Sequence, residues 1–405
     1  MKAYDPEIVL AAPVRTPIGK FGGVLAPLSA ADLGSAAAAG CLAVARGDAG
    51  ALDADAVDQV IFGHARQAGG GPNTARQVAA RTGVPVDRPA FTLNQACGSG
   101  LQSVFAAARA IRLGEARVVL AGGTESMSNT PYLLPRARWG QRLGHDQIVD
   151  GMYRDGFNDP LSGLVMGETA EELAEKYGID RDASDVWAVG SQNRCETARA
   201  RGRFAREIVP VTVPGRRRDE PTVVAHDEHP RDGVDRAALA KLKPVFRDGG
   251  RVTAGNASGI TDGAAALLVA SSEAAHALGL RVVARLVDTA TVGVEPRIMG
   301  IGPVPAVRQL LERQGLEADA IDEVELNEAF ACQVLACLHD LPFDPARVNP
   351  DGGAISLGHP IGATGARILV TLLHGLDERQ GRLGLATLCV SGGLGLAALV
   401  ERLDA

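Results

Sequence analysis

The first residue whose setting suggests chemistry is a cysteine in a glycine-rich turn. Cys97 lies in the segment 94–100, Asn-Gln-Ala-Cys-Gly-Ser-Gly, directly after a run, 90–93, that is expected to form a strand. Free backbone N–H groups and the dipole at the start of a following helix stabilise a thiolate, so Cys97 is a candidate nucleophile. The alternative is a buried structural cysteine. The helix is predicted from one apolar face, formed by Leu101, Val104, Phe105, Ala108 and Ile111.

A histidine and a second cysteine stand in similar turns later in the chain. His359 lies between a glycine and a proline in the segment 349–365, and histidine is the usual residue for activating a thiol. The alternative is a loop histidine that is bonded to a carbonyl group. Cys389 ends an apolar strand and enters a glycine-rich turn with Ser391, and the N–H groups of such a turn can point at an oxyanion.

An asparagine completes the set of candidates. Asn327 follows a short strand, where its amide could hold a water or a backbone group. The alternative is a helix N-cap before Glu328.

The elements that must position these residues repeat along the chain. The segment 54–63 matches 318–327, and each copy is followed by a glycine-rich turn, a small-residue helix and an apolar strand, at 117–123 and 385–390. The order predicts two related halves with an α/β architecture, in which helices cover both faces of mixed sheets. The alternative is chance similarity between two acidic junctions. Because the turns of Cys97, His359 and Cys389 occupy equivalent places, we expect one shared site between the halves.

The segment between the halves, 128–258, has a different character. It holds both tryptophans and a basic cluster, Arg216, Arg217 and Arg218, and is loop-rich from 132 to 164. Helices are predicted over 168–177 and 184–201. Long loops in compact enzymes are usually functional, so we interpret this segment as a lid or a substrate-binding subdomain.

Composition narrows the class of protein. The chain has 405 residues, enough for two or three domains, and its 46% hydrophobic and 22% charged residues exclude general disorder. A net charge of −7 argues against a protein that coats nucleic acid. The six cysteines show no CxxC and no metal-ligand spacing with histidine, which predicts reduced thiols in a cytoplasmic protein without a metal site.

Two apolar segments could be mistaken for targeting or membrane elements. Residues 8–12 follow two acidic residues and are predicted to be a first strand, not a signal peptide. Residues 384–400 fall short of the roughly 20 that a spanning helix needs, so a buried β-hairpin is expected and no membrane partner.

The motifs, in order, resemble those of the thiolase family, of the acetyl-CoA acetyltransferase type, and the similarity covers nearly the whole chain. The resemblance implies a duplicated five-layer α/β/α/β/α fold. Its parts would be an N-terminal half of residues 1–127 plus 259–280, an inserted loop domain of residues 128–258 and a C-terminal half of residues 281–405. Members form homodimers or homotetramers. The matching segments are 8–19, 94–100, 253–264, 327–331, 352–367 and 389–393.

The resemblance also implies a role for each matching residue. Cys97 would be the nucleophile that becomes acylated, and Cys389 the acid/base that takes a proton from the α-carbon of the second substrate. His359 would activate the nucleophile and donate to an oxyanion hole, and Asn327 would hold the water that completes it. The backbone N–H of Ser391 would serve the other oxyanion hole.

Coenzyme A thioesters are substrates in this family, so no cofactor is expected; acyl-CoA and CoA are the expected ligands. Ser258 would contact the pantetheine arm. The remaining matching positions would line the acyl and pantetheine channel: Ala254, Ala329, Phe330, Phe246 and Met166.

One position departs from the family pattern. The biosynthetic acetoacetyl-CoA enzymes carry a histidine where this chain has Val165. A hydrogen-bond donor to the 3-oxo oxygen is then missing, and longer or branched 3-oxoacyl chains should be tolerated better.

The predicted activity is reversible Claisen condensation of acetyl-CoA with an acyl-CoA through an acyl-Cys97 intermediate. The preferred prediction within this class is an acetyl-CoA C-acetyltransferase. The alternatives are a 3-oxoacyl-CoA thiolase for longer chains and a non-catalytic acyl-CoA or lipid carrier. A Cys/His hydrolase would leave Cys389 without a task.

Overall fold

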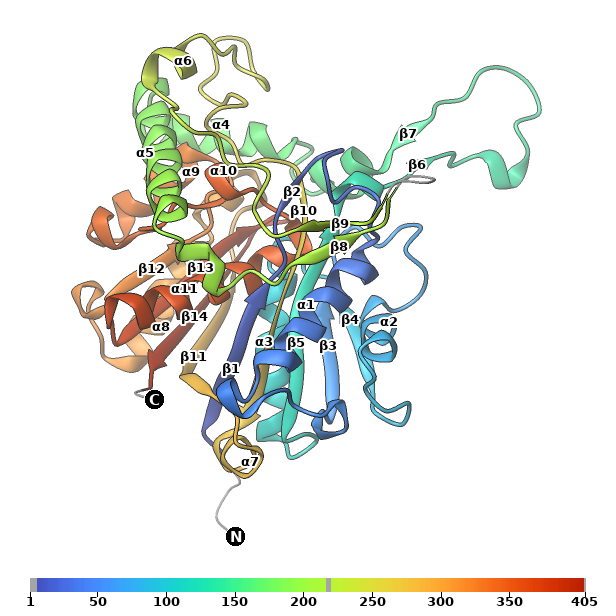
Figure 1. The fold of residues 1–405 in the computed structure, drawn as a ribbon. Helices are drawn as coiled ribbons and strands as arrows, with labels where there is room; N and C mark the ends of the chain where they lie inside the picture. Colours follow the sequence, from blue (N-terminus) through green and yellow to red (C-terminus); the bar gives the residue numbers. More distant parts are fainter. Residues whose placement is uncertain (1–5, 216–219, 404–405) are drawn as a thin grey trace.

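The computed structural model describes residues 6–215 and 220–403. The basic cluster of Arg216, Arg217 and Arg218 therefore lies outside the described residues. One hydrogen-bonded path of strands runs through both halves of the chain (Figure 1). Its order is β12 (Glu323–Leu326), β13 (Leu383–Val390), β14 (Leu394–Arg402), β11 (Val282–Gly293), β1 (Ile8–Arg15), β10 (Thr261–Ser271), β5 (Val118–Ser126), β3 (Gln59–Gly63) and β4 (Ala90–Leu93), with β2 (Gly19–Lys20) paired to β10.

The predicted repeat is present in the structure. A 3₁₀ turn precedes β3 at Ala54–Ala56 and precedes β12 at Ala318–Ala320. Strand β3 is parallel to β4 and β5, and β12 is parallel to β13. The turns that carry Cys97 and His359 lead into two equivalent helices, α3 (Ser99–Arg112) and α11 (Ile361–Arg379), which pack against each other.

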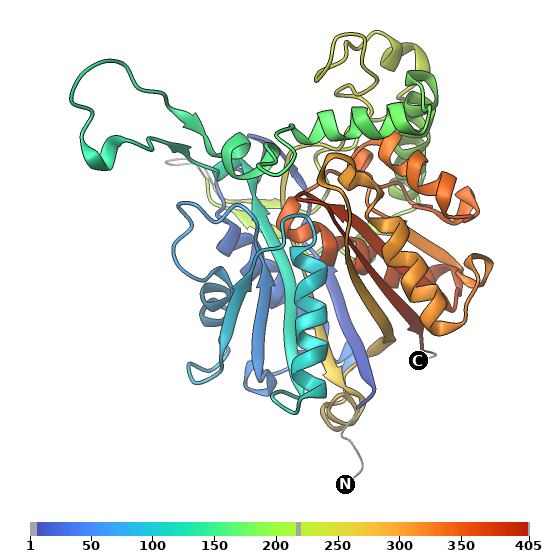
Figure 2. The ribbon, with the colours of Figure 1, turned by 180° about the vertical axis from the view of Figure 1, so that it is seen from behind.

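The helices form three layers with the strands between them. Helices α1 (Ala30–Val44) and α2 (Thr74–Arg81) cover the outer face of the N-terminal strands, and α8 (Pro303–Gln314) and α9 (Ala331–Asp340) that of the C-terminal strands. Helices α3 and α11 contact strands of both halves, and Figure 2 shows α3 on the face opposite α1. Separate hydrophobic clusters fill the spaces between the layers. The predicted α/β class and five layers are confirmed.

The two short apolar segments have the predicted structures. Residues 8–12 belong to β1, and residues 384–400 lie in the antiparallel hairpin β13–β14, which is almost wholly buried. Within the described ranges, no helix combines the length and apolar character that crossing a bilayer requires.

The inserted segment contributes helices and an extended loop. Its main helices are α4 (Met166–Lys176) and α5 (Arg181–Ala200), each starting two or three residues earlier than predicted. The loop between β6 (Tyr132–Leu133) and β7 (Val149–Asp150) projects away from the body (Figure 1). The other short elements are β8 (Val211–Val213), β9 (Thr222–Val224), α6 (Arg236–Ala240) and, outside the insertion, α7 (Ser272–Leu278) and α10 (Ala354–Leu357).

The limits of the three domains stay a prediction, although β10 returns after the insertion to lie between β1 and β5.

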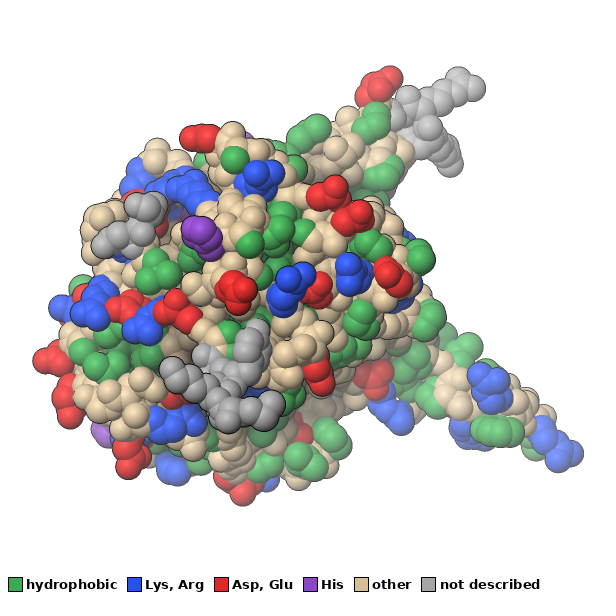
Figure 3. Space-filling model, turned by 90° about the horizontal axis from the view of Figure 1, so that it is seen from below, with side chains coloured by type: hydrophobic (Ala, Val, Ile, Leu, Met, Phe, Trp, Pro, Cys, Tyr) green, Lys and Arg blue, Asp and Glu red, His purple; other side chains and the backbone are tan. Residues whose placement is uncertain are grey.

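On the face that Figure 3 shows, side chains of both charge signs are interspersed. The absence of a nucleic-acid partner also remains a prediction.

Glycines bring the first turns of α3 and α11 into backbone contact. A Cβ on Gly365 would overlap the backbone nitrogen of Leu101, and a Cβ on Gly100 would lie 2.7 Å from the nitrogen of Ala366. Such an approach leaves no room for a side chain. The turns that carry Cys97 and His359 are therefore held together by backbone packing.

Gly365→Ala tests this contact. Because the added methyl group would meet backbone of α3, we expect the free energy of unfolding to fall by about 1–3 kcal/mol. Urea denaturation monitored by circular dichroism measures the change.

Gly190→Ala in α5 is the matched control, since a Cβ there meets the end of the Arg194 side chain at 3.1 Å and no backbone atom. It should be neutral or stabilise by up to about 1 kcal/mol, because alanine favours a helix over glycine. Equal stability of the two variants would contradict the packing argument.

Candidate active site

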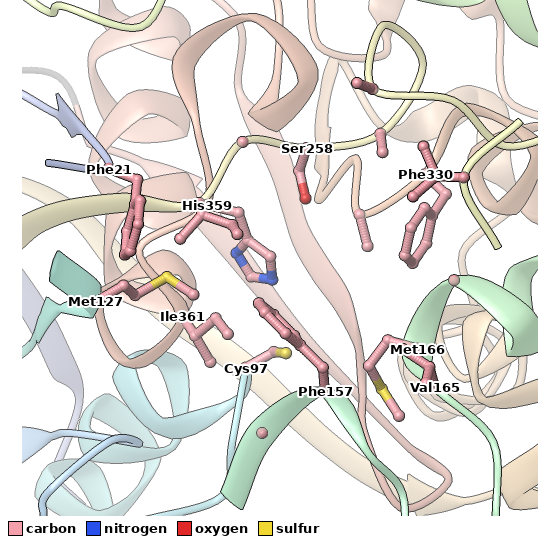
Figure 4. Close-up of a pocket in the computed structure, with 18 of the residues that line it drawn as sticks. Phe21, Cys97, Met127, Phe157, Val165, Met166, Ser258, Phe330, His359 and Ile361 are labelled. Atoms are coloured by element: carbon pink, nitrogen blue, oxygen red, sulfur yellow. The ribbon is translucent and has the colours of Figure 1, made fainter. Parts of the chain in front are cut away.

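A cavity of about 480 Å³ brings the predicted residues together. Cys97, His359, Cys389 and Ser391 all line it, with side chains from both halves and from the insertion. Figure 4 shows the side chains of His359 and Cys97 in this cavity, with the ring of Phe157 between them in the view. The shared site between the halves, predicted from the repeat, is present.

The strand topology explains this meeting. The carboxyl ends of parallel strands lie at the same edge of a sheet, so β3, β4 and β5 deliver the residues that follow them to one place. In the C-terminal half, β12 and β13 do the same for Asn327 and for the turn after Cys389. Gly98 packs against Val390 and Leu396, which joins the two edges.

The turn before Cys97 has a constrained backbone. Ala96 has φ = 45°, the left-handed region that a residue with a Cβ seldom adopts. Its N–H donates to Asn94 Oδ1 at 2.9 Å, and its carbonyl accepts from Ser99 Oγ at 2.7 Å. Side chains of the motif therefore hold the conformation that presents Cys97 at the start of α3.

Burial raises the pKa of the Cys97 thiol. The nearby charge of Arg66 and a hydrogen bond from the backbone N–H of Ser391 lower this pKa, but they do not outweigh burial. Backbone N–H groups therefore favour the thiolate, as predicted, but in the unliganded protein they do not bring the pKa of Cys97 down to its usual value. The reason is that the cost of removing a charge from water exceeds the effect of the local dipoles.

His359 is a buried, neutral imidazole. Its Nδ1 lies 2.6 Å from Thr364 Oγ1, which in turn donates to the carbonyl of Pro360 at 3.0 Å. Since a hydroxyl has one proton, Thr364 must accept from Nδ1–H, which leaves Nε2 free as a base. Burial, and then the charges of Arg367 and Arg66, lower the pKa of His359 to about 3. Its side-chain partner is a hydroxyl, so the alternative of a ring bonded to a carbonyl is wrong.

Cys389 is buried at the end of β13. Burial, and then the proximity of Cys97, raise its pKa well above the usual value. Gly392 and Gly393, both with φ = 85°, turn the chain directly after Ser391. This turn directs the N–H of Ser391 at the sulfur of Cys97.

Asn327 is buried just beyond β12 and is not among the residues that line the cavity. Both polar atoms of its amide lack a hydrogen-bond partner among the described residues. The N-cap alternative is wrong, because α9 begins at Ala331 with Phe330 as its N-cap. Buried amides are nearly always bonded, so this one is suited to holding a water.

The residues predicted for the substrate channel all line the cavity: Ser258, Ala254, Phe246, Met166, Ala329 and Phe330. The rings of Phe246 and Phe330 meet edge to face with centroids 6.4 Å apart. Val165 lines the cavity as well, at the N-cap of α4. The wall at this position is therefore apolar, as the departure from the family pattern predicts.

Sequence reasoning missed several residues of the cavity. Met127, Phe157 and Ile361 add apolar wall, and Arg66 adds a cation. Arg66 and Met127 could have been found, because they follow β3 and β5, which belong to the same set of parallel strands as β4, and β4 leads to Cys97. Phe157 lies in the loop-rich part of the insertion, where the sequence shows no periodicity that would place a side chain.

No group of histidine, cysteine and acidic side chains suited to a metal ion occurs within the part of the chain that the structure describes. All six cysteines are unpaired.

Comparison with known proteins agrees with this geometry. The family model "Thiolase, N-terminal domain" matches residues 8–273, and "Thiolase, C-terminal domain" matches residues 280–402. The acetyl-CoA acetyltransferase of Pseudomonas aeruginosa is 50% identical over 396 residues, which cover 98% of this chain and 99% of that protein. A probable acetyl-CoA acyltransferase of Staphylococcus aureus is 47% identical, with the same coverage of both chains.

Solved structures give the same result. The acetyl-CoA acetyltransferase of Bacillus anthracis is 43% identical and has a TM-score of 0.95, covering 99% of this chain and 100% of that one. Human mitochondrial 3-ketoacyl-CoA thiolase in complex with CoA is 39% identical with a TM-score of 0.93, and 98% of each chain is covered. By sequence and by structure, this chain belongs to the thiolase family.

Proposed function

We propose that the protein is an acyltransferase that joins acetyl-CoA to an acyl-CoA, or cleaves 3-oxoacyl-CoA with CoA, through an acyl group on Cys97. One observation carries this proposal: Cys97, His359 and Cys389 line one cavity, and the N–H of Ser391 points at the Cys97 sulfur. A nucleophile, two acid–base groups and a hydrogen-bond donor are what Claisen chemistry on a thioester needs.

Acylation begins from a neutral pair. Nε2 of His359 takes the thiol proton of Cys97, and the sulfur attacks the thioester carbonyl. The C–S bond to CoA then breaks, and His359 returns the proton to the departing CoA thiolate. The N–H of Ser391 lies beside the Cys97 sulfur, where it would stabilise the oxyanion of the attacked carbonyl.

Condensation follows on the acylated enzyme. Cys389 first loses its thiol proton to solvent, and its thiolate takes the α-proton of acetyl-CoA. The enolate carbon attacks the acyl carbonyl while the bond to Cys97 breaks, and the released Cys97 thiolate recovers a proton from solvent. The charge of Cys97 is one reason why the pKa of Cys389 is raised. Because an acylated Cys97 cannot ionise, no thiolate at Cys97 opposes the ionisation of Cys389 before the enolate attacks. His359 and a water on Asn327 would receive the enolate oxygen.

The relatives' names favour acetyl transfer as the reaction. A second candidate, cleavage of longer 3-oxoacyl-CoA, is favoured by the apolar wall of Val165, Met166 and Phe157.

CoA would enter past Ser258, with Lys20 and Arg231 also on the lining. The homodimer or homotetramer, the cytoplasmic location and the lack of a cofactor stay predictions.

Intact-mass analysis after incubation with acetyl-CoA tests the proposed nucleophile. We expect an acetyl adduct on the wild-type protein and on Cys389→Ala, but none on Cys97→Ser, since only the first sulfur is acylated. Cys389→Ala should also lose about 10²–10⁴-fold in condensation rate, because it lacks the base. An adduct that survives Cys97→Ser would disprove the assignment, and no adduct at saturating acetyl-CoA would favour a non-catalytic carrier.

The pKa of Cys97 predicts how its reactivity depends on pH. Only the thiolate reacts with iodoacetamide, and burial raises the pKa above the usual 9.0. The alkylation rate of Cys97 should therefore rise about tenfold per pH unit through the neutral range, without a plateau below pH 9. Peptide mass mapping on Cys389→Ala isolates this residue, and a plateau below pH 7 would show that the thiolate is already stabilised.

Thiolysis of acetoacetyl-CoA and of longer 3-oxoacyl-CoAs tests the role of Val165. The wild-type protein should have the higher kcat/KM for longer chains. Val165→His should shift the ratio toward acetoacetyl-CoA by up to about tenfold, since one hydrogen bond to the 3-oxo oxygen is gained. Val165→Leu is the control, which adds bulk without a donor; a strong wild-type preference for acetoacetyl-CoA would end this hypothesis.

A further inference from the structure

Arg66 is a cation in the cavity to which the proposed mechanism assigns no task. It follows β3 by three residues, at the edge where the parallel strand β4 leads to Cys97. Its side chain lines the cavity and the residue is only 8% exposed. Its charge lowers the pKa of both Cys97 and His359, so the guanidinium lies close to the reacting groups.

The guanidinium of Arg66 fits a space beside the insertion but makes no hydrogen bond. A Cβ on Gly156 would overlap its atoms, so a glycine in the insertion makes the space for it. Its Nε is buried without a hydrogen bond, and the described residues provide the guanidinium with no hydrogen bond or ion pair. The charge of Arg66 helps to lower the pKa of the buried Glu125, so this acid lies near the guanidinium. However, Glu125 accepts its hydrogen bonds from the backbone nitrogens of Arg66 and Gly362 and pairs with His64 at 3.2 Å, not with the guanidinium.

A buried guanidinium normally donates hydrogen bonds to an anion, and the guanidinium of Arg66 donates none to a described residue. Because Arg66 lines the cavity, an anion bound in the cavity would reach its guanidinium. The wall near Arg66 is otherwise apolar: Ala65 clusters with Met127, Ile361, Cys97 and Phe157. The cluster on the Cys389 side is a different one, with Phe246, Ala329 and Phe330. Apolar walls with one cation suit an aliphatic chain that ends in an anion.

We propose that Arg66 selects acyl groups that carry a terminal carboxylate, so that the preferred acyl donors are CoA thioesters of dicarboxylic acids. This inference rests on the proposed function, because it places the acyl group on Cys97. The methylene groups of the chain lie against the apolar cluster, and the carboxylate pairs with the guanidinium. A role of Arg66 in activating Cys97 would instead affect every acyl donor alike, which makes the two roles separable.

The test compares acyl donors in pairs of equal length: succinyl-CoA with butyryl-CoA, glutaryl-CoA with pentanoyl-CoA, and adipyl-CoA with hexanoyl-CoA. The readout is the ratio of kcat/KM within each pair, for condensation with acetyl-CoA. The wild-type protein should prefer the carboxylate member of at least one pair by about tenfold or more. Arg66→Met should lower that ratio by about 30-fold or more, because a buried charge pair is lost, and Arg66→Lys should keep part of it.

Two further variants control the result. Arg231→Met removes another cation from the lining of the cavity. Both members of a pair carry the same CoA, so this change should leave the ratio unaltered. Gly156→Ala keeps the charge but displaces the guanidinium, so it should lower the ratio as well. This variant tests the proposal independently if Arg66→Met does not fold.

The proposal is overturned if the wild-type protein prefers the uncharged member of every pair, or if Arg66→Met slows both members equally. A ratio that falls equally in Arg231→Met would overturn it as well, since the effect would then be one of overall charge. Failure of the proposed function looks different, because no acyl donor, acetyl-CoA included, would then label Cys97 in the wild-type protein.

Discussion

Backbone contact between the first turns of α3 and α11 is the constraint on which the site depends. Each helix begins directly after a turn with a left-handed residue, Ala96 in one and Gly358 in the other, and each turn presents a reactive side chain. Glycines let the two backbones touch, so Cys97 and His359 cannot move apart without opening the packed layer between the sheets. Glu125 also joins the two turns, since its carboxylate accepts from the backbone N–H of Gly362 at 2.8 Å and from the backbone N–H of Arg66 at 3.1 Å.

Burial then determines the charge state of the resting site. It raises the pKa of both cysteines and lowers that of His359, so all three groups are neutral in the unliganded protein. In the proposed mechanism, charges arise only while substrate is bound, beside donors such as the N–H of Ser391. A dry site with fixed donors stabilises such transient charge more than water does.

The two sides of the cavity differ in what they offer a substrate. The side of Ser258, Phe246 and Phe330 is apolar and fits the role of a channel for the pantetheine arm. The side of Cys97 and Phe157 is also apolar but includes the guanidinium of Arg66. Family membership therefore accounts for the chemistry, whereas this local contrast bears on which acyl chain is used.

The sequence by itself determined the α/β class, the repeat and the identity of the reactive turns, because periodicity and glycine placement are local properties. The motif at Cys97, for example, holds its own turn through Asn94 and Ser99. Only the tertiary structure decided the pKa of Cys97, the tautomer of His359, the unpaired amide of Asn327 and the exposure of Arg66 to the cavity. These properties depend on desolvation and on partners far away in the chain, and a local pattern does not encode either of them.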